Sequence, residues 1–339
     1  MKKLFSKMGI VLTNQCNQRC SWCFEGEWKR ENKQIMTLEN INRLLHWKKW
    51  DDGHVPVVYL LGGEPTLHPK LLEIVDMIHD FNPKISVFLL TNLTCKQQLL
   101  KELVSRKVVI FANIDQFEPD NNVANQSKIL DNLAYLNKET PEGYQYNISA
   151  TVSTPDKDFE FLYRILENGR NKIYNLRLAP SCIGFECKNQ FQKNLGNEYY
   201  EKVLQVLQRC IEIKPNLHLS TECATNGCMI SDELYSKLYK MGYKLRYECG
   251  LPEPNADILP DLSCHWCFAF EKVPELKIDN VLEFPDDINL LDEMYRRYQE
   301  FNEKNQYFCD PSACGHSECK GACAALNYYA YKQIKEVNK

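Results

Sequence analysis

The sequence predicts an α/β protein built on a parallel sheet that curls into a full or partial barrel. Six short apolar segments alternate with amphipathic helical segments in the first half of the chain, a pattern typical of βα units. The chain has 339 residues, of which 44% are hydrophobic and 25% charged. It is therefore long enough and apolar enough for a barrel with an appended region. The unusual feature is cysteine, present 16 times.

The expected strands are short apolar runs, and segments with helical periodicity lie between them. In chain order, the strands are expected at 6–13, 55–61, 85–91, 108–115, 146–153 and 176–180. The helices between them are expected at 37–50, 69–80, 96–106, 127–137 and 157–168. Because all six strands would run in one direction, their carboxyl ends would meet at one edge of the sheet.

The region after the sixth strand has a different character. It begins with an expected helix at 198–213, a short strand at 218–221 and a helix at 232–241, and nine of the sixteen cysteines lie from Cys223 onward. Pro252, Pro254 and Pro260 interrupt regular structure there. We therefore expect a barrel domain at 1–215 and a cysteine-rich domain at 216–339 that includes a C-terminal helix.

Composition excludes several classes of protein. Lys and Arg number 41 against 45 for Asp and Glu, so no basic excess indicates a nucleic-acid partner. The longest apolar runs, at 55–61 and 108–112, are far shorter than the ~20 residues of a membrane span. The N-terminus has no sustained apolar stretch typical of a signal peptide. We expect a cytoplasmic protein whose cysteines bind metal or clusters rather than form disulfides.

Three cysteines directly follow the first expected strand. Cys16, Cys20 and Cys23 form a C-x3-C-x2-C pattern in a loop at the strand's carboxyl end, which is the edge where barrel enzymes place their active sites. Three thiolates can hold three irons of a four-iron cluster and leave the fourth iron open, whereas structural zinc usually takes four protein ligands. The odd number therefore favours a cluster with an exchangeable position.

This triplet, with Trp22 before its last cysteine, resembles the signature loop of the radical S-adenosylmethionine (SAM) enzymes. Gly62-Gly63-Glu64-Pro65, at the end of the second strand, resembles the GGEP segment of the same family. The resemblance implies a partial (β/α)6 TIM-like barrel with SAM and a 4Fe–4S cluster on Cys16, Cys20 and Cys23. It also implies that Gly62, Gly63 and Glu64 hold the amino group of SAM. Further polar contacts to SAM are implied for Thr91, Asn92, Asn113, Asp115 and Ser153.

The later cysteines fall into two groups. The first contains Cys223, Cys228, Cys249, Cys264 and Cys267, and the second contains Cys309, Cys314, Cys319 and Cys323. Together they resemble the auxiliary-cluster extension called SPASM, or its shortened twitch form. The spacing Cys249-x12-Leu262-x4-Cys267 follows the extension's Cys, Gly, Cys pattern, but Leu262 stands where the pattern has glycine.

The resemblance leaves the ligands of one or two auxiliary 4Fe–4S clusters open. In one arrangement Cys223, Cys228, Cys249 and Cys267 hold one cluster, and Cys309, Cys314, Cys319 and Cys323 hold the other. In the second arrangement Cys323 joins the first cluster, and the other cluster takes Asp310, Cys264 or substrate as a further ligand. The role of Cys264 is open, and zinc binding at these cysteines is the competing interpretation.

The function implied by the resemblance is cleavage of SAM to a 5′-deoxyadenosyl radical that abstracts hydrogen from a peptide or protein side chain. The outcome would be an oxidation such as a crosslink, a thioether or a dehydrogenation, with flavodoxin or ferredoxin as external reductant. One alternative is a small-molecule dehydrogenase. Another is a redox-neutral peptide epimerase in which Cys182, Cys187 or Cys223 returns a hydrogen atom. A non-catalytic zinc or electron-transfer protein is the alternative from a different class.

Overall fold

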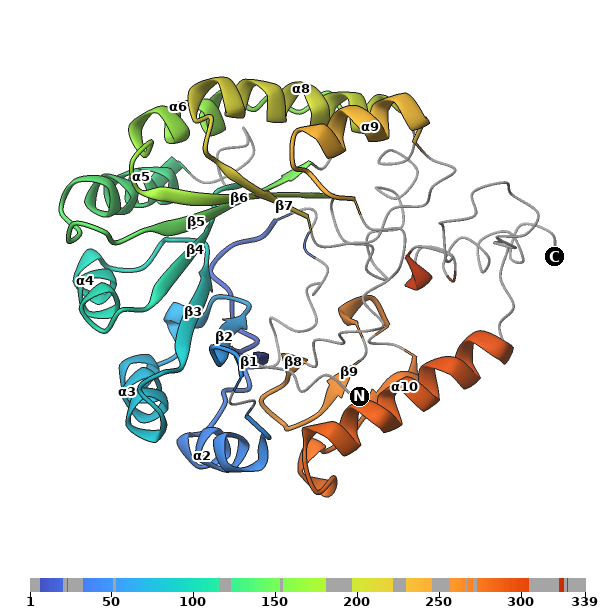
Figure 1. The fold of residues 1–339 in the computed structure, drawn as a ribbon. Coiled ribbons are helices and arrows are strands. Elements are labelled where there is room, and N and C mark those ends of the chain that lie inside the picture. The colour runs from blue at the N-terminus through green and yellow to red at the C-terminus, as the bar shows by residue number, and fades with distance from the viewer. Residues whose placement is uncertain are drawn as a thin grey trace.

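The computed structural model describes the greater part of the chain. The described residues are 7–20, 23, 33–50, 53–115, 123–152, 155–180, 197–221, 230–245, 257–265, 267–270, 273–304, 323–325 and 328. Their strands form one ten-stranded sheet in the order β10-β9-β8-β1-β2-β3-β4-β5-β6-β7. Figure 1 shows this sheet as a curved surface with helices along its outer side.

The first six strands pair in chain order, and every pair among them is parallel. They are β1 (Lys7–Thr13), β2 (Val57–Gly62), β3 (Ser86–Thr91), β4 (Val109–Asn113), β5 (Tyr146–Val152) and β6 (Ile173–Pro180). The helices between them are α2 (Leu38–Trp47), α3 (Leu71–Phe81), α4 (Gln97–Ser105), α5 (Val123–Lys138) and α6 (Glu160–Asn168). The α/β class expected from the sequence is therefore confirmed.

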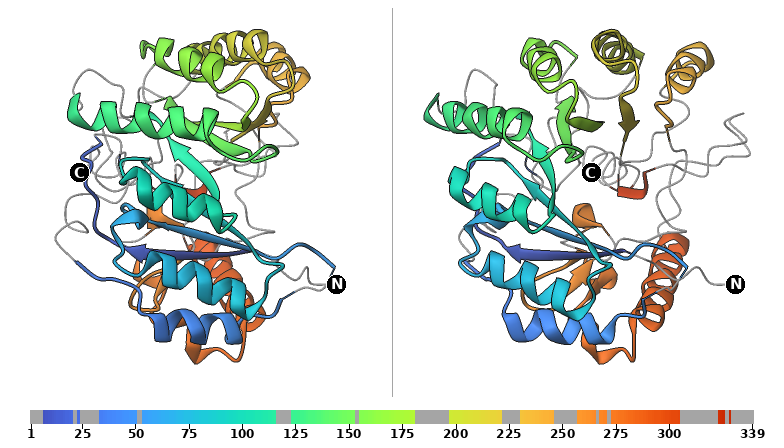
Figure 2. Two further views of the ribbon diagram at one scale, coloured as in Figure 1. Left: turned by 90° about the vertical axis from the view of Figure 1, so that its left-hand side faces the viewer. Right: turned by 60° about the vertical axis from the view of Figure 1, so that its left-hand side comes forward.

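The helices cover the outer face of the sheet, as the two turned views in Figure 2 also show. Burial alternates along β3, where every second side chain is buried, because one face packs against helices and the other faces the inside of the curve. Local signals place the helices. The Thr37 side chain accepts a hydrogen bond from the Asn40 backbone nitrogen and caps α2. None of the described helices is long and apolar enough to cross a membrane.

Later segments extend the sheet at both ends. After α8 (Asn197–Ile213), β7 (His218–Ser220) pairs in parallel with β6, and α9 (Asp232–Lys240) follows. At the other end β8 (Asp257–Ile258) pairs in parallel with β1, placing Asp257 opposite Gly9. The short strands β9 (Cys264–His265) and β10 (Lys277–Ile278) then add antiparallel pairs. A division of the chain near residue 215 stays a prediction.

A buried ion pair fastens the last described long helix to the first helix of the sheet. In α10 (Asp287–Lys304), the first residue accepts from the Lys48 Nζ atom at 2.6 Å and from the Lys49 backbone nitrogen at 2.8 Å. The Lys48 and Asp287 side chains are only 2% and 9% exposed. Trp47 at the end of α2 donates from its ring nitrogen to the Phe284 carbonyl. Helix α10 is thus anchored directly on the end of α2.

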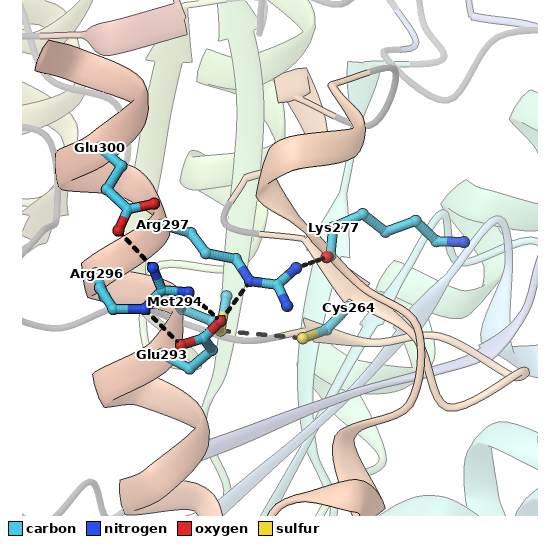
Figure 3. Close-up of polar contacts among 7 residues, drawn as sticks. All are labelled: Cys264, Lys277, Glu293, Met294, Arg296, Arg297 and Glu300. Carbon is cyan, nitrogen blue, oxygen red and sulfur yellow. Dashed lines mark hydrogen bonds and ion pairs between the residues drawn. The ribbon is translucent and has the colours of Figure 1, made fainter. Parts of the chain in front are cut away.

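A second contact holds α10 on the β9–β10 hairpin (Figure 3). Glu293 accepts from both Arg296 and Arg297, and Arg297 also donates to the Lys277 carbonyl at 2.5 Å. Arg296 makes a further ion pair with Glu300. The two guanidinium groups hold the pKa of the Glu293 carboxyl at about 2, well below its ordinary value.

This low pKa predicts an acid-dependent contribution to stability. Because the folded protein binds the Glu293 proton more weakly than the unfolded chain, the contribution is present above about pH 5 and is lost as pH falls toward 2. We expect Glu293→Gln to lower the free energy of unfolding by about 1 kcal/mol at pH 7. Denaturant unfolding at pH 7 and pH 3 measures this, and the gap between wild type and variant should narrow at pH 3. An equal gap at both values would contradict the assignment.

Candidate active site

The carboxyl ends of the first two strands meet closely enough to require glycine. The Gly63 backbone nitrogen donates to the Thr13 carbonyl at 2.9 Å, and the Glu64 nitrogen donates to the Gln15 carbonyl at 2.7 Å. Gly62 has φ +151°, and a Cβ atom there would lie 2.4 Å from the Thr13 carbonyl oxygen. The two glycines therefore let the end of β2 touch the segment that leads into the cysteine loop.

Glu64 joins the end of β2 to the end of β3. Its carboxylate is buried and accepts from Thr66 N, Thr66 Oγ1 and Thr91 Oγ1 on Oε1, and from Asn92 N on Oε2. Burial raises the pKa of the Glu64 carboxyl above its ordinary value, and the donors from Thr66, Asn92 and Thr91 oppose that rise. Oε1 takes three donors and Oε2 one, so Oε2 keeps acceptor capacity. The interaction of Glu64 with the amino group of SAM stays a prediction.

The three cysteines of the N-terminal loop lie beside this junction. Cys16, Cys20 and Cys23 are all partly exposed. The Cys16 sulfur accepts from the Gln18 backbone nitrogen at 3.4 Å, and the Cys23 nitrogen donates to the Cys20 carbonyl at 3.1 Å. The latter bond joins the backbones of the second and third cysteines.

The donor set of this loop fits a cluster. Within the described ranges, no three His, Cys, Asp or Glu side chains converge on a position for a single metal ion. In a four-iron cluster each thiolate binds a different iron, so the three sulfurs need not converge. The loop also holds two buried polar atoms that have no hydrogen-bond partner, Asn14 Oδ1 and Gln18 Nε2. Contacts among the described residues therefore leave part of the hydrogen-bonding capacity of this loop unused.

Asn113 is the last residue of β4 and Asp115 follows the strand, but the structure gives the two side chains separate surroundings. Asp115 is buried and accepts from Thr151 N at 2.6 Å, from Thr151 Oγ1 at 2.9 Å and from Lys157 Nζ at 3.2 Å. These contacts join the segment after β4 to Thr151 on β5 and to Lys157, which follows β5. Asn113 instead accepts from Arg177 Nη2 at 3.3 Å on the inner face of the sheet. A contact of either side chain with SAM stays a prediction.

The inner face carries polar residues that sequence reasoning did not select. Arg177 on β6 donates from Nε and Nη2 to Ser149 Oγ on β5, and its guanidinium lies 4.6 Å from the centre of the Phe111 ring. Asn175 donates to Ser220 on β7. A signal was present in the sequence, because polar residues at alternate positions of otherwise apolar strands are typical of an inner barrel face.

The turn between β8 and β9 explains the departure from the expected glycine. Leu262 has φ +66°, the left-handed conformation that favours glycine. Its nitrogen donates to the Leu259 carbonyl at 2.9 Å, and the Leu259 nitrogen donates to the Ser263 carbonyl at 2.8 Å. The Leu262 side chain is buried, so packing offsets the backbone strain. Residue 262 is therefore a leucine with the backbone conformation that is typical of glycine.

The two cysteines of this hairpin have opposite surroundings. Cys264 is fully buried on β9, and its sulfur lies 3.9 Å from the Met294 sulfur on α10 (Figure 3). Burial raises the pKa of the Cys264 thiol to about 12, which disfavours the thiolate that binds metal. Cys267, just past β9, is exposed. Cys323, the last cysteine of the chain, is partly buried. The geometry therefore favours Cys267 over Cys264 as an auxiliary ligand.

Several expected site residues lie outside the described residues. These are Ser153, Cys182, Cys187, Cys223, Cys228, Cys249, Cys309, Asp310, Cys314 and Cys319. Of the expected SAM contacts that are described, Gly62, Gly63, Glu64, Thr91 and Asn92 lie together beside the cysteine loop. Asn17, which joins the loop to Asn92, was not selected from the sequence.

The fold and this site agree with a family comparison. Residues 10–160 match the family model described as the Radical SAM superfamily. Residues 10–160 therefore form a radical SAM domain, and the family of this domain uses SAM and a 4Fe–4S cluster. The matched residues include the cysteine loop and the Gly62–Glu64 segment.

Proteins with similar sequences include GTP 3′,8-cyclases. A GTP 3′,8-cyclase of Helicobacter pylori is 23% identical over 285 residues, which are 83% of this chain and 81% of that protein. A GTP 3′,8-cyclase of Alkaliphilus oremlandii is 32% identical over 129 residues, which are 35% of this chain and 39% of that protein.

Solved structures show the same fold. The structure of anSMEcpe with bound AdoMet and Cp18Cys peptide has a TM-score of 0.62 and 19% identity, covering 97% of this chain and 95% of that one. The structure of Streptococcus suis SuiB bound to S-adenosylmethionine also has a TM-score of 0.62 and 19% identity, and the match covers 95% of this chain and 71% of that chain. At this identity the likeness concerns the fold.

Proposed function

We propose that this radical SAM enzyme oxidises a side chain of a peptide or protein substrate, with one or two auxiliary iron–sulfur clusters in residues 216–339. The β8–β9 hairpin carries this proposal. It continues the barrel sheet from β1, turns through a left-handed Leu262 at the position of the pattern's glycine, and leaves Cys267 exposed just beyond β9. Leu262 and Cys267 are the second and third positions of the spacing that resembles the Cys, Gly, Cys pattern of the SPASM extension.

The residues proposed to act have distinct tasks. Cys16, Cys20 and Cys23 would hold the 4Fe–4S cluster, and the Gly62–Gly63 backbone with Glu64, Thr91 and Asn92 would hold the methionine end of SAM. When bound and given one electron by an external reductant, these cofactors would supply a 5′-deoxyadenosyl radical that removes a hydrogen atom from the substrate, and the auxiliary clusters would accept the electron that the substrate radical loses. The chain's own part is to orient SAM on a rigid sheet edge and to exclude competing reactions.

Peptide chemistry gains support from the comparison with anSMEcpe, whose structure contains a peptide and which this chain matches over nearly its whole length. The auxiliary ligands proposed are Cys267 and Cys323 among the described residues, with Cys223, Cys228, Cys249, Cys309, Cys314 and Cys319. Buried Cys264 is left out of this set.

A small-molecule substrate is the second candidate. It is favoured by the extended sequence similarity to GTP 3′,8-cyclases, which covers most of this chain at 23% identity. Redox-neutral epimerisation of a peptide is distinguished from oxidation by the mass of the product. Dehydrogenation removes about two hydrogens, whereas epimerisation leaves the mass unchanged.

Metal content is the first test. We expect anaerobically prepared protein to contain about twelve irons per chain, falling to about eight when Cys16, Cys20 and Cys23 are all changed to Ala. About eight falling to four would leave one auxiliary cluster and favour the small-molecule candidate. Cys210→Ala is the matched control, since Cys210 is buried in α8 and burial raises its thiol pKa to about 12. Zinc in place of iron would overturn the proposal.

A further inference from the structure

Three polar side chains form a closed hydrogen-bonded ring between the cysteine loop and the turn after β3. Asn17 Nδ2 donates to Thr94 Oγ1 at 2.8 Å, Thr94 Oγ1 donates to Asn92 Oδ1 at 2.6 Å, and Asn92 Nδ2 donates to Asn17 Oδ1 at 2.9 Å. Each side chain donates once and accepts once around the ring. Linked bonds of this kind polarise one another and fix a geometry more firmly than separate bonds do.

The turn that carries two members of the ring is rigid. Leu93, between Asn92 and Thr94, is fully buried and has φ +59°, a strained conformation that persists only where its surroundings enforce it. Asn132 Nδ2 provides that support by donating to the Leu93 and Cys95 carbonyls, both at 2.9 Å. Asn92 N and Thr91 Oγ1 are bound in turn to the buried Glu64 carboxylate.

The third member belongs to a different kind of segment. Asn17 lies between Cys16 and Cys20 and is itself exposed, whereas Asn92 and Thr94 are 6% and 5% exposed. The Asn17 amide is therefore the point at which an exposed loop is fastened to a rigid, buried turn. A loop that carries the three proposed iron ligands thereby gains a fixed position on the Glu64 side of the site.

We propose that the Asn17–Asn92–Thr94 ring is a positioning device that sets the cysteine loop against the SAM-binding edge. This inference rests on the proposed function, because it assigns the loop to the cluster and Glu64 to SAM. When residues that orient metal ligands without binding the metal are altered, metal affinity or activity commonly falls by about 10- to 100-fold. The ring would act in this way on SAM affinity and on the electronic environment of the cluster.

The test compares Thr94→Val, which removes only the ring hydroxyl, with Thr94→Ser, which keeps it. Full-length protein is reconstituted anaerobically with iron and sulfide, and SAM affinity is measured by calorimetry. EPR spectra of the reduced protein with and without SAM report the cluster that SAM contacts. We expect Thr94→Val to weaken SAM binding about tenfold and to shift or broaden the EPR signal observed with SAM. Thr94→Ser should behave as wild type. Asn17→Ala should match Thr94→Val.

Thr140→Val controls for the loss of a buried hydroxyl elsewhere. Thr140 donates to the Leu136 carbonyl at the end of α5, at 2.7 Å, and this variant should keep the wild-type SAM affinity and spectra. Wild-type behaviour of Thr94→Val, or an equal effect of Thr140→Val, would overturn the proposed role of the ring. Neither result would overturn the proposed function. A wild-type protein whose EPR spectrum does not respond to SAM would overturn the proposed function, and the role of the ring with it.

Discussion

Replacing Gly63 with alanine is expected to reduce SAM cleavage at least about 100-fold. A Cβ atom at this position would lie 2.4 Å from the Gln15 carbonyl oxygen, 2.7 Å from the Gln15 carbonyl carbon and 2.9 Å from the Asn14 carbonyl oxygen. All three are backbone atoms, so no side chain can rotate away. The segment directly before Cys16 would have to shift, and displacements near 1 Å are enough for an effect of this size. Formation of 5′-deoxyadenosine with dithionite as reductant measures it.

Gly143→Ala is the matched control for this substitution. Gly143 has φ +81°, but a Cβ atom there would meet nothing within 4 Å. This variant should lose about 1 kcal/mol of stability through backbone strain and keep wild-type SAM cleavage. If Gly63→Ala cleaves SAM as fast as Gly143→Ala, the close approach of β2 to the cysteine loop does not govern the site.

Removing the Asp287 side chain is expected to cost about 3–5 kcal/mol of unfolding free energy. Asp287→Ala takes away the carboxylate that the buried Lys48 ammonium contacts at 2.6 Å. It also takes away the acceptor of the Lys49 backbone nitrogen. A buried charge that loses its partner costs more than the pair itself contributes, because neither water nor another charge replaces the contact.

A double-mutant cycle separates these effects. Lys48→Met removes the ammonium, and Asp287→Asn retains an acceptor for the Lys49 nitrogen, so the double variant should be more stable than Asp287→Ala. Denaturant unfolding of the single and double variants gives the coupling energy. A loss below about 1 kcal/mol for Asp287→Ala would mean that the pair behaves like a surface ion pair.

The barrel was predictable because its signals are local and repeated. The expected strand at 85–91 and the observed β3 (Ser86–Thr91) differ by one residue, since a short continuous apolar run is visible directly in the sequence. The sixth strand begins at Ile173 rather than at 176. The start of this strand was not predicted because Tyr174 and Asn175 do not continue a buried apolar run. Tyr174 is exposed and stacks on His218 of β7. That partner is more than forty positions away in the sequence.

The parts of the site that lie in short sequence motifs could be predicted from the sequence. The spacing of Cys16, Cys20 and Cys23 and the Gly62–Glu64 segment indicated the right edge of the sheet, since both follow strands directly. The partners of Glu64 could not be read from the sequence, because Thr91 and Asn92 reach it only through the pairing of β2 with β3. The burial of Cys264 against Met294 likewise depends on how α10 packs on the hairpin.

The pairing of β8 with β1 has a consequence for how such a chain can evolve. β1 leads into the cysteine loop, and it is bordered by β2 on one side and by β8 on the other. Without β8, the backbone of Gly9 and Ile10 would become an open sheet edge, a template for association with other chains. Recombination that exchanges the C-terminal region as a cassette would therefore have to bring a replacement strand with it. Inheritance of the two parts as one piece is the simpler history for this architecture.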